Sequence, residues 1–129
     1  MREILFRGKD VESRFWCFGE LSHDREGKPH IRFWGHNGYL LREVMPETVG
    51  QFIGITDMNN KRIFEGDIVF TESNGMDEED GNAVIEWDED TACFVIKWHD
   101  LTCDFDNFFG HELEIIGNIY DSPELLEVQ

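Results

Sequence analysis

The sequence predicts a mainly β protein, in the form of a small single-domain barrel or sandwich with one short C-terminal helix. Three observations support this fold class. About seven to nine short segments rich in aromatic and β-branched residues carry strand signals. Turn residues separate these segments at intervals of about 8 to 12 residues. A chain of 129 residues, 40% of them hydrophobic, is long and apolar enough to enclose one packed core.

The chain is expected to form a single domain over residues 1–129, with two regions of different character. Residues 1–49 hold the N-terminal strands, and residues 50–129 hold a central hairpin and an acidic β region. In the second region, Gly-Asp followed by apolar β-branched residues is common in SH3-like barrels, so an SH3-like barrel is one candidate for residues 50–120. That analogy concerns the fold and carries no function.

The N-terminal region contains three extended segments and one that allows two interpretations. Residues 1–8, 14–21 and 30–35 have the composition and alternation of strands. Residues 39–49 are compatible with a strand or with a short helix that stops before Pro46. We favour an irregular or extended conformation, because the residue before a proline avoids the helical region.

Residues 50–70, GQFIGITDMNNKRIFEGDIVF, combine strand signals with two tight corners. A turn cluster at residues 57–61 separates two extended segments, which predicts a hairpin. Aspartate and asparagine side chains bond their own backbone in such turns, and Asn60 is the best non-glycine candidate for a left-handed position. The corner Glu65-Gly66-Asp67 then directs the chain into another strand.

The C-terminal half continues with strands and ends in a short helix. Residues 82–88 and 92–98 are predicted strands joined by a hairpin turn, and the second should be central because both its faces carry apolar groups. Residues 101–109 are expected to form a loop or a short edge element, and residues 112–120 a further strand. A Ser cap and Pro at the first helical position predict a final helix at residues 122–127.

The net charge of −17 is concentrated in the second half of the chain. Residues 1–64 contain ten Lys or Arg and nine Asp or Glu, a balance of +1. Residues 65–129 contain one base, Lys97, and nineteen acids, a balance of −18, and the two halves add to the stated −17. A field of this sign repels phosphates, so direct binding to duplex nucleic acid is disfavoured and attraction to basic surfaces is favoured.

Cysteine usage and hydropathy indicate a cytoplasmic protein. Cys17, Cys93 and Cys103 form an odd set without a C-x-x-C pair, which suits buried thiols in a reducing compartment better than a disulfide framework. The first residues lack the apolar core of a signal peptide, and no apolar run approaches 18 residues, so no membrane contact is expected.

No motif supplies a recognisable catalytic, metal or cofactor site. A G-x-S-x-G nucleophile motif is absent from the sequence, although a cysteine and a histidine distant in sequence could still meet in space. His99, Cys103 and His111 are donors that zinc accepts, but a fourth ligand is missing and the spacing matches no common finger. The acidic runs lack calcium-loop spacing. We therefore expect no cofactor and no catalysis.

Two tripeptides combine arginine with aromatic residues, at residues 14–16 and 32–34. Exposed aromatic residues beside basic ones can stack on single-stranded nucleic acid. The favoured interpretation is that the aromatic residues face a β core and the arginines lie on the outer face.

The stretch of residues 50–70 resembles the YopX family, small proteins mostly encoded by phages and prophages, whose shared pattern is close to YTGLKDKNGKEIYEGDIV. The opening MREILFRG at residues 1–8 and the closing IGNIYD at residues 116–121, followed by PELL, extend the resemblance over nearly the whole chain. The sequence differs at Asn60, where the family usually has Gly, and at Phe52 and Phe64, where it usually has Tyr.

The resemblance implies a fold but no activity, because the family has no settled biochemical function. The motif residues are therefore interpreted as structural. They are Gly54, Asp57, Asn60, Gly66, Asp67, Gly117 and Asn118.

The function expected from these observations is that of a non-catalytic phage or prophage accessory protein that binds proteins through an acidic surface. In its most specific form, the hypothesis is a decoy: carboxylates imitate the phosphate row of DNA and occupy a basic host nucleic-acid-binding protein. The contacting residues would be Asp77, Glu78, Glu79, Asp80, Asp88, Glu89 and Asp90.

Three alternatives remain open at this point. The acidity could merely keep a small protein soluble. The protein could be a self-assembling structural module, a homo-oligomer in which the half with ten bases docks head to tail on the acidic half and Trp16 or Trp34 anchors the interface. It could also be a small enzyme with a Cys/His site.

Overall fold

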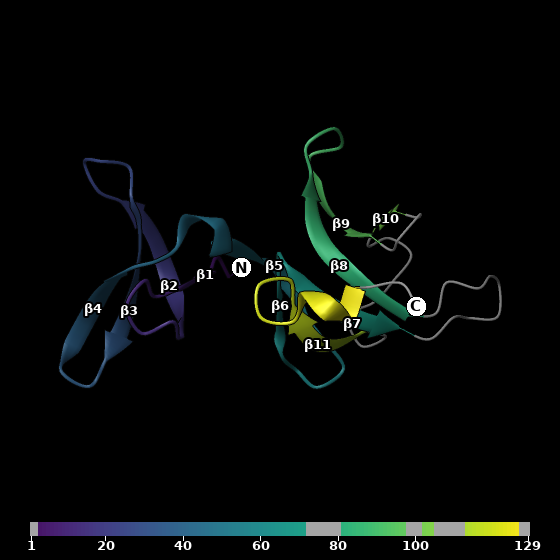
Figure 1. Cartoon of the computed structure of the whole chain (residues 1–129), viewed down its shortest axis with the longest axis horizontal. Helices are drawn as coiled ribbons and strands as arrows, with labels where there is room; N and C mark the ends of the chain where they lie inside the picture. The colour runs from purple at the N-terminus through teal and green to yellow at the C-terminus, as the bar shows by residue number, and fades with distance from the viewer. Residues whose placement is uncertain (1–2, 72–80, 98–101, 105–112, 127–129) are drawn as a thin grey trace. The chain divides into compact units, whose positions relative to one another are not determined.

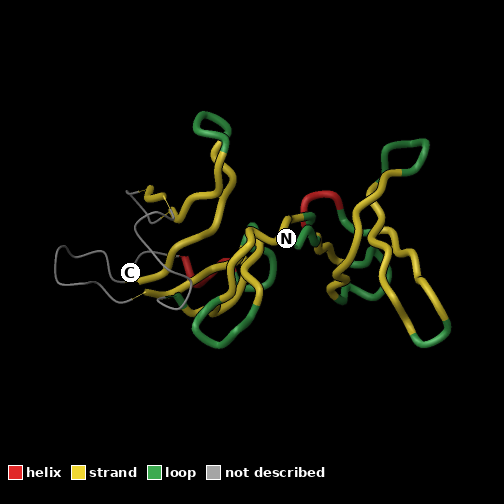
Figure 2. Tube along the Cα trace, turned by 180° about the vertical axis from the view of Figure 1, so that it is seen from behind, coloured by secondary structure: helices red, strands yellow, loops and turns green. Residues whose placement is uncertain are grey.

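The computed structural model describes residues 3–71, 81–97, 102–104 and 113–126, and it confirms a mainly β protein (Figure 1). The described strands are antiparallel and the helical segments are single short turns, which Figure 2 marks in red. The chain divides into two compact units, Met1–Gly54 and Ile55–Gln129, which we call unit 1 and unit 2 and describe separately. The expectation of a single domain stays a prediction.

Unit 1 is built on antiparallel strands in the spatial order β4-β3-β2-β1-β5. A bridge between Asp10 and Val44 also joins the residue after β1 to the residue after β4. A 3-10 helix, η1, connects β4 to β5. The bounds are β1 (Phe6–Lys9), β2 (Trp16–His23), β3 (Pro29–Gly35), β4 (Gly38–Glu43), η1 (Pro46–Thr48) and β5 (Gly50–Thr56), whose last residues belong to unit 2.

The core of unit 1 lies on one face of these strands. Cys17, Ile31 and Val44 are buried there, and the partly buried hydrophobic residues around them are Phe6, Leu21, Phe33 and Val49. The backbone of Gly8 lies so close to Val44 that a Cβ at this position would stand 2.8 Å from the valine Cβ. The end of β1 and the residue after β4 therefore pack directly against each other.

The segment 39–49 resolves into β4 followed by η1. Met45, the residue before Pro46, has φ −69° and ψ 122°, which is the extended conformation that a following proline imposes. The extended interpretation of this segment is correct for its first part, and the proline then starts the 3-10 turn.

Unit 2 contains a five-stranded antiparallel sheet in the order β10-β9-β8-β7-β11. Strands β7 to β10 follow one another as a meander, and β11 returns to pair with β7. The bounds are β6 (Arg62–Phe64), β7 (Asp67–Thr71), β8 (Gly81–Asp88), β9 (Cys93–Lys97), β10 (Thr102–Asp104), β11 (Glu114–Asn118) and a 3-10 helix, η4 (Pro123–Leu126). β6 pairs with the end of β5 rather than with this sheet.

The described strands form open sheets, so they do not make the closed barrel that the sequence allowed. The SH3-like assignment of residues 50–120 stays a prediction. β9 lies between β8 and β10, and both Val95 and Ile96 are buried, which confirms that this strand is central. The predicted C-terminal helix is a single 3-10 turn, in which the N–H of Leu125 donates to the carbonyl of Ser122, three residues earlier.

The predicted turn between β5 and β6 is present and depends on a left-handed residue. Asn60 has φ 63°, as predicted, and its N–H donates to the Asp57 carbonyl at 3.0 Å. Residues other than glycine and asparagine pay a steric penalty of about 1–2 kcal/mol in this conformation, because Cβ approaches the following carbonyl oxygen.

Replacing Asn60 should therefore separate backbone strain from side-chain chemistry. We expect Asn60→Ala to be less stable than Asn60→Gly by about 1 kcal/mol, because glycine adopts the left-handed conformation without the steric penalty of a Cβ atom. Chemical denaturation of the three proteins measures this. Equal stabilities for the alanine and glycine variants would contradict the role given to the left-handed turn.

Candidate functional site

The carboxylate of Asp57 closes the turn after β5 and ties it to β11. One oxygen, Oδ1, accepts hydrogen bonds from the backbone N–H groups of Asn59 at 2.8 Å and Lys61 at 2.9 Å. The other, Oδ2, accepts from the N–H of Ile115 at 3.0 Å. The side chain is only 3% exposed. A buried carboxylate is stable only with such donors, so the turn and β11 are coupled through one residue.

These donors also keep Asp57 ionised. Burial raises its pKa, but the N–H groups of Ile115, Lys61 and Asn59, together with the positive charge of Lys61, outweigh burial and hold the pKa below the ordinary value of 3.8. A carboxyl group whose folded pKa is depressed contributes stability above its unfolded pKa and loses that contribution as the pH falls through the folded pKa. The contribution of Asp57 is therefore complete at neutral pH and disappears in acid.

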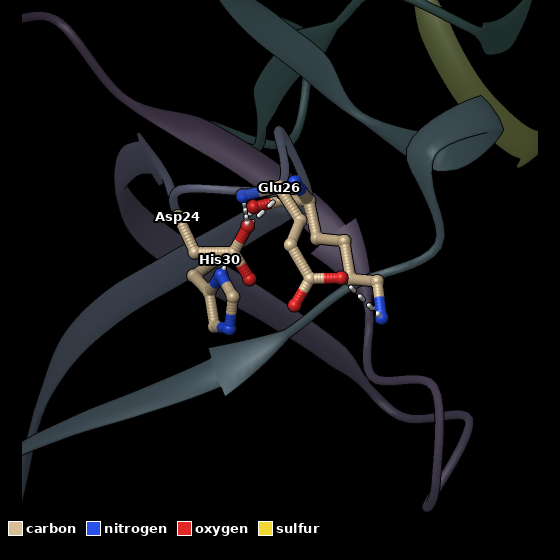
Figure 3. A network of polar contacts seen from close by, with 4 residues as sticks. Asp24, Glu26 and His30 are labelled. Atoms are coloured by element: carbon tan, nitrogen blue, oxygen red, sulfur yellow. Dashed lines mark hydrogen bonds and ion pairs between the residues drawn. The ribbon is translucent and has the colours of Figure 1, made fainter.

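The same turn occurs a second time in unit 1, between β2 and β3. Oδ1 of Asp24 accepts from the N–H groups of Glu26 and Lys28, both at 2.9 Å, and the Asp24 N–H donates to the Lys28 carbonyl at 3.0 Å (Figure 3). Gly27, with φ 85°, occupies the position that Asn60 has in unit 2. Asp24 is exposed, however, and its carboxylate accepts these bonds from the backbone of its own turn. Asp24 therefore provides a matched comparison for Asp57.

The corner at Glu65-Gly66-Asp67 is organised by a second buried carboxylate. Asp67 is 2% exposed, and its Oδ2 accepts from the N–H of Phe64 at 2.8 Å. Gly66, with φ 87°, donates its N–H to the Ile85 carbonyl at 2.8 Å and accepts from the N–H of Ile119 at 2.9 Å. This corner thus connects β8 with the segment that follows β11.

The other motif residues also act on the backbone. Oδ1 of Asn118 accepts from the N–H groups of Tyr120 and Asp121, which turns the chain after β11. Gly117 lies at a bulge in the pairing of β11 with β7, where a Cβ would meet the side chains of Leu125 and Ser122. Gly54 has φ 104° and is the last residue of unit 1. These contacts support the structural interpretation of the motif.

The predicted acidic surface is only partly within the described residues. Asp88, Glu89 and Asp90 form the turn between β8 and β9, where Glu89 and Asp90 are exposed. Asp88 stabilises this turn, because its carboxylate accepts from the N–H of Asp90 at 3.1 Å and from the Thr91 hydroxyl at 2.9 Å. The other four acids, Asp77, Glu78, Glu79 and Asp80, lie outside the described residues.

An exposed aromatic and aliphatic surface in unit 1 was not identified as a site from the sequence. Trp34 on β3 is 70% exposed and stands edge to face against Tyr39 on β4, with ring centroids 4.7 Å apart. The guanidinium of Arg32 lies over the Tyr39 ring at 4.1 Å. Leu40 and Leu41 continue this surface along β4. This surface arises because Tyr39 pairs with Trp34, and Leu41 with Arg32, across β3 and β4. The sequence indicates these pairs only if residues 38–43 are recognised as a strand.

The two arginine–aromatic tripeptides have mixed surroundings. Phe33 packs against the core as expected, but Trp34 and Phe15 are exposed. Trp16 is half-buried, and the guanidinium of Arg7 lies over its ring at 4.6 Å. The assignment of all these aromatic residues to the core is therefore wrong for Trp34 and Phe15.

The cysteines do not form an evident nucleophilic site in the described part of the chain. Burial raises the pKa of the Cys17 thiol, which lowers its thiolate fraction. Cys93 contacts the Thr91 hydroxyl at 3.1 Å. His99 and His111 and the side chain of Cys103 are outside what the structure describes. Among the described side chains, no group of three or more His, Cys, Asp or Glu is arranged to hold a metal ion.

A family model described as YopX protein matches residues 5–127. The chain belongs to the YopX family. A solved structure similar to this YopX chain is that of protein EF1440 from Enterococcus faecalis, with 20% sequence identity and a TM-score of 0.61. The alignment covers 98% of this chain and 100% of EF1440, and at this identity it shows a shared fold alone. The comparison with curated proteins gives no match. In the described residues of this YopX chain, no helix has the length and hydropathy needed to span a membrane.

The contribution of the buried Asp57 can be measured against its exposed counterpart. We expect Asp57→Ala to lower the free energy of unfolding by about 3 kcal/mol, because three N–H donors lose a charged acceptor. Asp24→Ala removes the two equivalent turn bonds in an exposed setting and should cost clearly less. Denaturation at neutral pH and at pH below 3.8 provides the measurement.

The difference between the wild type and Asp57→Ala should shrink in acid, where Asp57 of the wild type becomes protonated. If the two alanine variants were equally stable at neutral pH, the bond to Ile115 would contribute nothing, and the coupling of the turn to β11 would be refuted.

Proposed function

We propose that this YopX protein is a non-catalytic accessory protein of the phage or prophage type that binds a basic protein partner through unit 2. The observation that supports the proposal is the unequal distribution of net charge between unit 1 and unit 2. Residues of unit 1 include eight Lys or Arg and eight Asp or Glu, a balance of zero. Residues of unit 2 include three bases and twenty acids, a balance of −17 that equals the charge of the whole chain.

A net charge that served only solubility has no reason to be confined to one unit. Confinement concentrates the electrostatic potential on one part of the molecule, which accelerates and orients association with a partner of opposite charge. One of the three bases of unit 2, Lys97, is already paired with Glu86 at 3.8 Å. Glu89 and Asp90 are exposed, so their carboxylates are accessible to a partner.

A nucleic-acid-binding protein is the partner class that best matches this chemistry. Its site is basic because it neutralises phosphates, and carboxylates carried on a β scaffold can replace those phosphates. The free thiols of Cys17 and Cys93 support a location in the reducing cytoplasm of the host cell. The head-to-tail assembly and the enzymatic alternative remain predictions without a specific supporting contact.

Binding from host lysate tests the proposal when two charge variants are compared with the wild type. The unit 2 variant carries Asp77→Asn, Glu78→Gln, Glu79→Gln, Asp80→Asn, Asp88→Asn, Glu89→Gln and Asp90→Asn. The control variant carries Glu12→Gln, Glu20→Gln, Glu26→Gln and Glu47→Gln in unit 1. We expect the wild type and the control to retain the same nucleic-acid-binding protein, which elutes with salt and is displaced by added DNA, while the unit 2 variant loses it.

Identical sets of retained proteins from the wild type and the unit 2 variant, or none from either, would contradict the proposal. The acidic unit would then be a solvated surface. Retention that DNA does not displace would refute the decoy form of the hypothesis and keep only binding to a basic partner.

A further inference from the structure

The outer edge of β4 has backbone groups directed away from its own sheet. In an antiparallel pair, successive residues alternate between bonding to the partner strand and pointing away from it. The N–H of Val44 donates to the Pro29 carbonyl at 3.0 Å, so Arg42 and Leu40, two and four residues earlier, also bond toward β3. Tyr39 and Leu41 therefore direct their N–H and C=O groups outward.

The pairing beyond the end of β4 confirms this alternation. The carbonyl of Glu43, which has the same parity as Tyr39 and Leu41, points away from β3 and accepts from the N–H of Val11 at 3.1 Å. Residues 9–11 thus cover the outer edge at Glu43 and Val44. In the described part of the chain, β4 ends the strand order of its sheet, and the edge from Tyr39 to Leu41 continues past this cover.

The exposed edge is also apolar on both faces of the strand. Tyr39 is 57% exposed, Leu40 43% and Leu41 58%. Proteins normally protect a free edge with charged residues, proline or a bulge, because an apolar edge pairs with another strand. None of these devices occurs among the three residues, and pairing would shield both the backbone groups and the side chains from water.

The charges of the chain indicate that the strand is supplied by a second copy. Unit 1 has a balance of zero, so two copies that approach through this unit meet less electrostatic repulsion than copies that approach through unit 2, where two balances of −17 come together. An antiparallel pair of two copies centred on Leu40 places Tyr39 opposite Leu41 in both directions, so apolar residues meet at each of these positions. Gly38 then lies opposite Arg42 and leaves space for its long side chain.

We propose that two copies of this chain pair antiparallel through β4, with the two-fold axis at Leu40. The two Tyr39–Leu41 pairs are the hydrogen-bonded ones, because these residues direct their backbone groups outward. The two Leu40 residues form the non-hydrogen-bonded pair, with a Cα–Cα distance of about 4.5 Å. The contact is isologous, so it closes as a dimer. It does not involve the acidic turn and is independent of the proposed partner of unit 2.

A cysteine at the axis tests this geometry directly. A Cα–Cα distance of about 4.5 Å lies within the range that a disulfide accepts. Leu40→Cys should therefore give a covalent dimer on mild oxidation, well above the background from the native cysteines in the wild type. Ser22→Cys, exposed on β2 of the same sheet, is the control and should stay at that background.

Proline at an outward-pointing position separates pairing from folding. The N–H of Leu41 points away from β3, so Leu41→Pro removes no bond within the sheet of one copy but blocks the pairing of two. We expect sedimentation analysis to show a dimer for the wild type and an increase of at least about tenfold in the dimer Kd for Leu41→Pro. Leu40→Glu should act in the same direction, and Phe15→Glu, exposed in the segment between β1 and β2, should leave the dimer unchanged.

The wild-type dimer should persist in high salt, because backbone bonds and apolar contacts hold it. A monomeric wild type over the micromolar range would overturn the proposal and leave the edge to an extended segment of another protein. A dimer that survives Leu41→Pro and gives no Leu40→Cys disulfide, or one that dissociates in salt, would also overturn it, since the copies would then meet through another surface.

Discussion

The carboxylate of Asp57 is the interaction on which the second unit depends. One oxygen closes a five-residue turn, and the other reaches the backbone of β11, more than fifty residues later in the chain. A buried charge without donors would be costly, so the turn, the left-handed Asn60 and the position of Ile115 must form together. The backbone bond from Met58 to Leu113, at 2.9 Å, strengthens the same junction. The segment by which the family is recognised therefore serves to connect the turn after β5 with β11.

Because the residues of the family motif support the fold, the surfaces proposed for binding lie elsewhere in the chain. The two units differ in chemistry: unit 2 carries the whole net charge, and unit 1 presents a neutral apolar strand edge. Association through charge weakens with salt, whereas association through a strand edge depends on backbone bonds and buried apolar area. The two interactions that we propose, with a second copy and with a basic partner, therefore use separate surfaces.

The sequence predicted features that depend on local chemistry. The turn at residues 57–61, the left-handed Asn60 and the central position of β9 could be inferred from turn residues and from apolar groups on both faces of a strand. The sequence also contains the pattern for the second copy of this turn, at Asp24. Both segments have an Asp four residues before a Lys, and the residue before the Lys is Gly in one and Asn in the other.

Features that depend on distant pairing could not be predicted. Leu40 and Leu41 are side chains of a type that is usually buried in a core. They are exposed here because β4 lies at the end of the strand order. The bulge between Ile115 and Gly117 interrupts the alternation of β11, and the open order of the strands contradicts the closed barrel. The bond from Asp57 to Ile115 joins residues whose separation in sequence gives no signal.

Amide hydrogen exchange in the wild type and in Asp57→Asn distinguishes the two roles of the Asp57 carboxylate, in the turn and at β11. Asparagine keeps one acceptor oxygen for the turn but presents an NH₂ group in place of the second. We expect the Ile115 amide to exchange about tenfold faster or more in the variant, while the Asn59 and Lys61 amides and those of β2 and β3 keep their protection. Unchanged protection at Ile115, or an equal loss across both units, would contradict the claim that Asp57 joins the turn to β11.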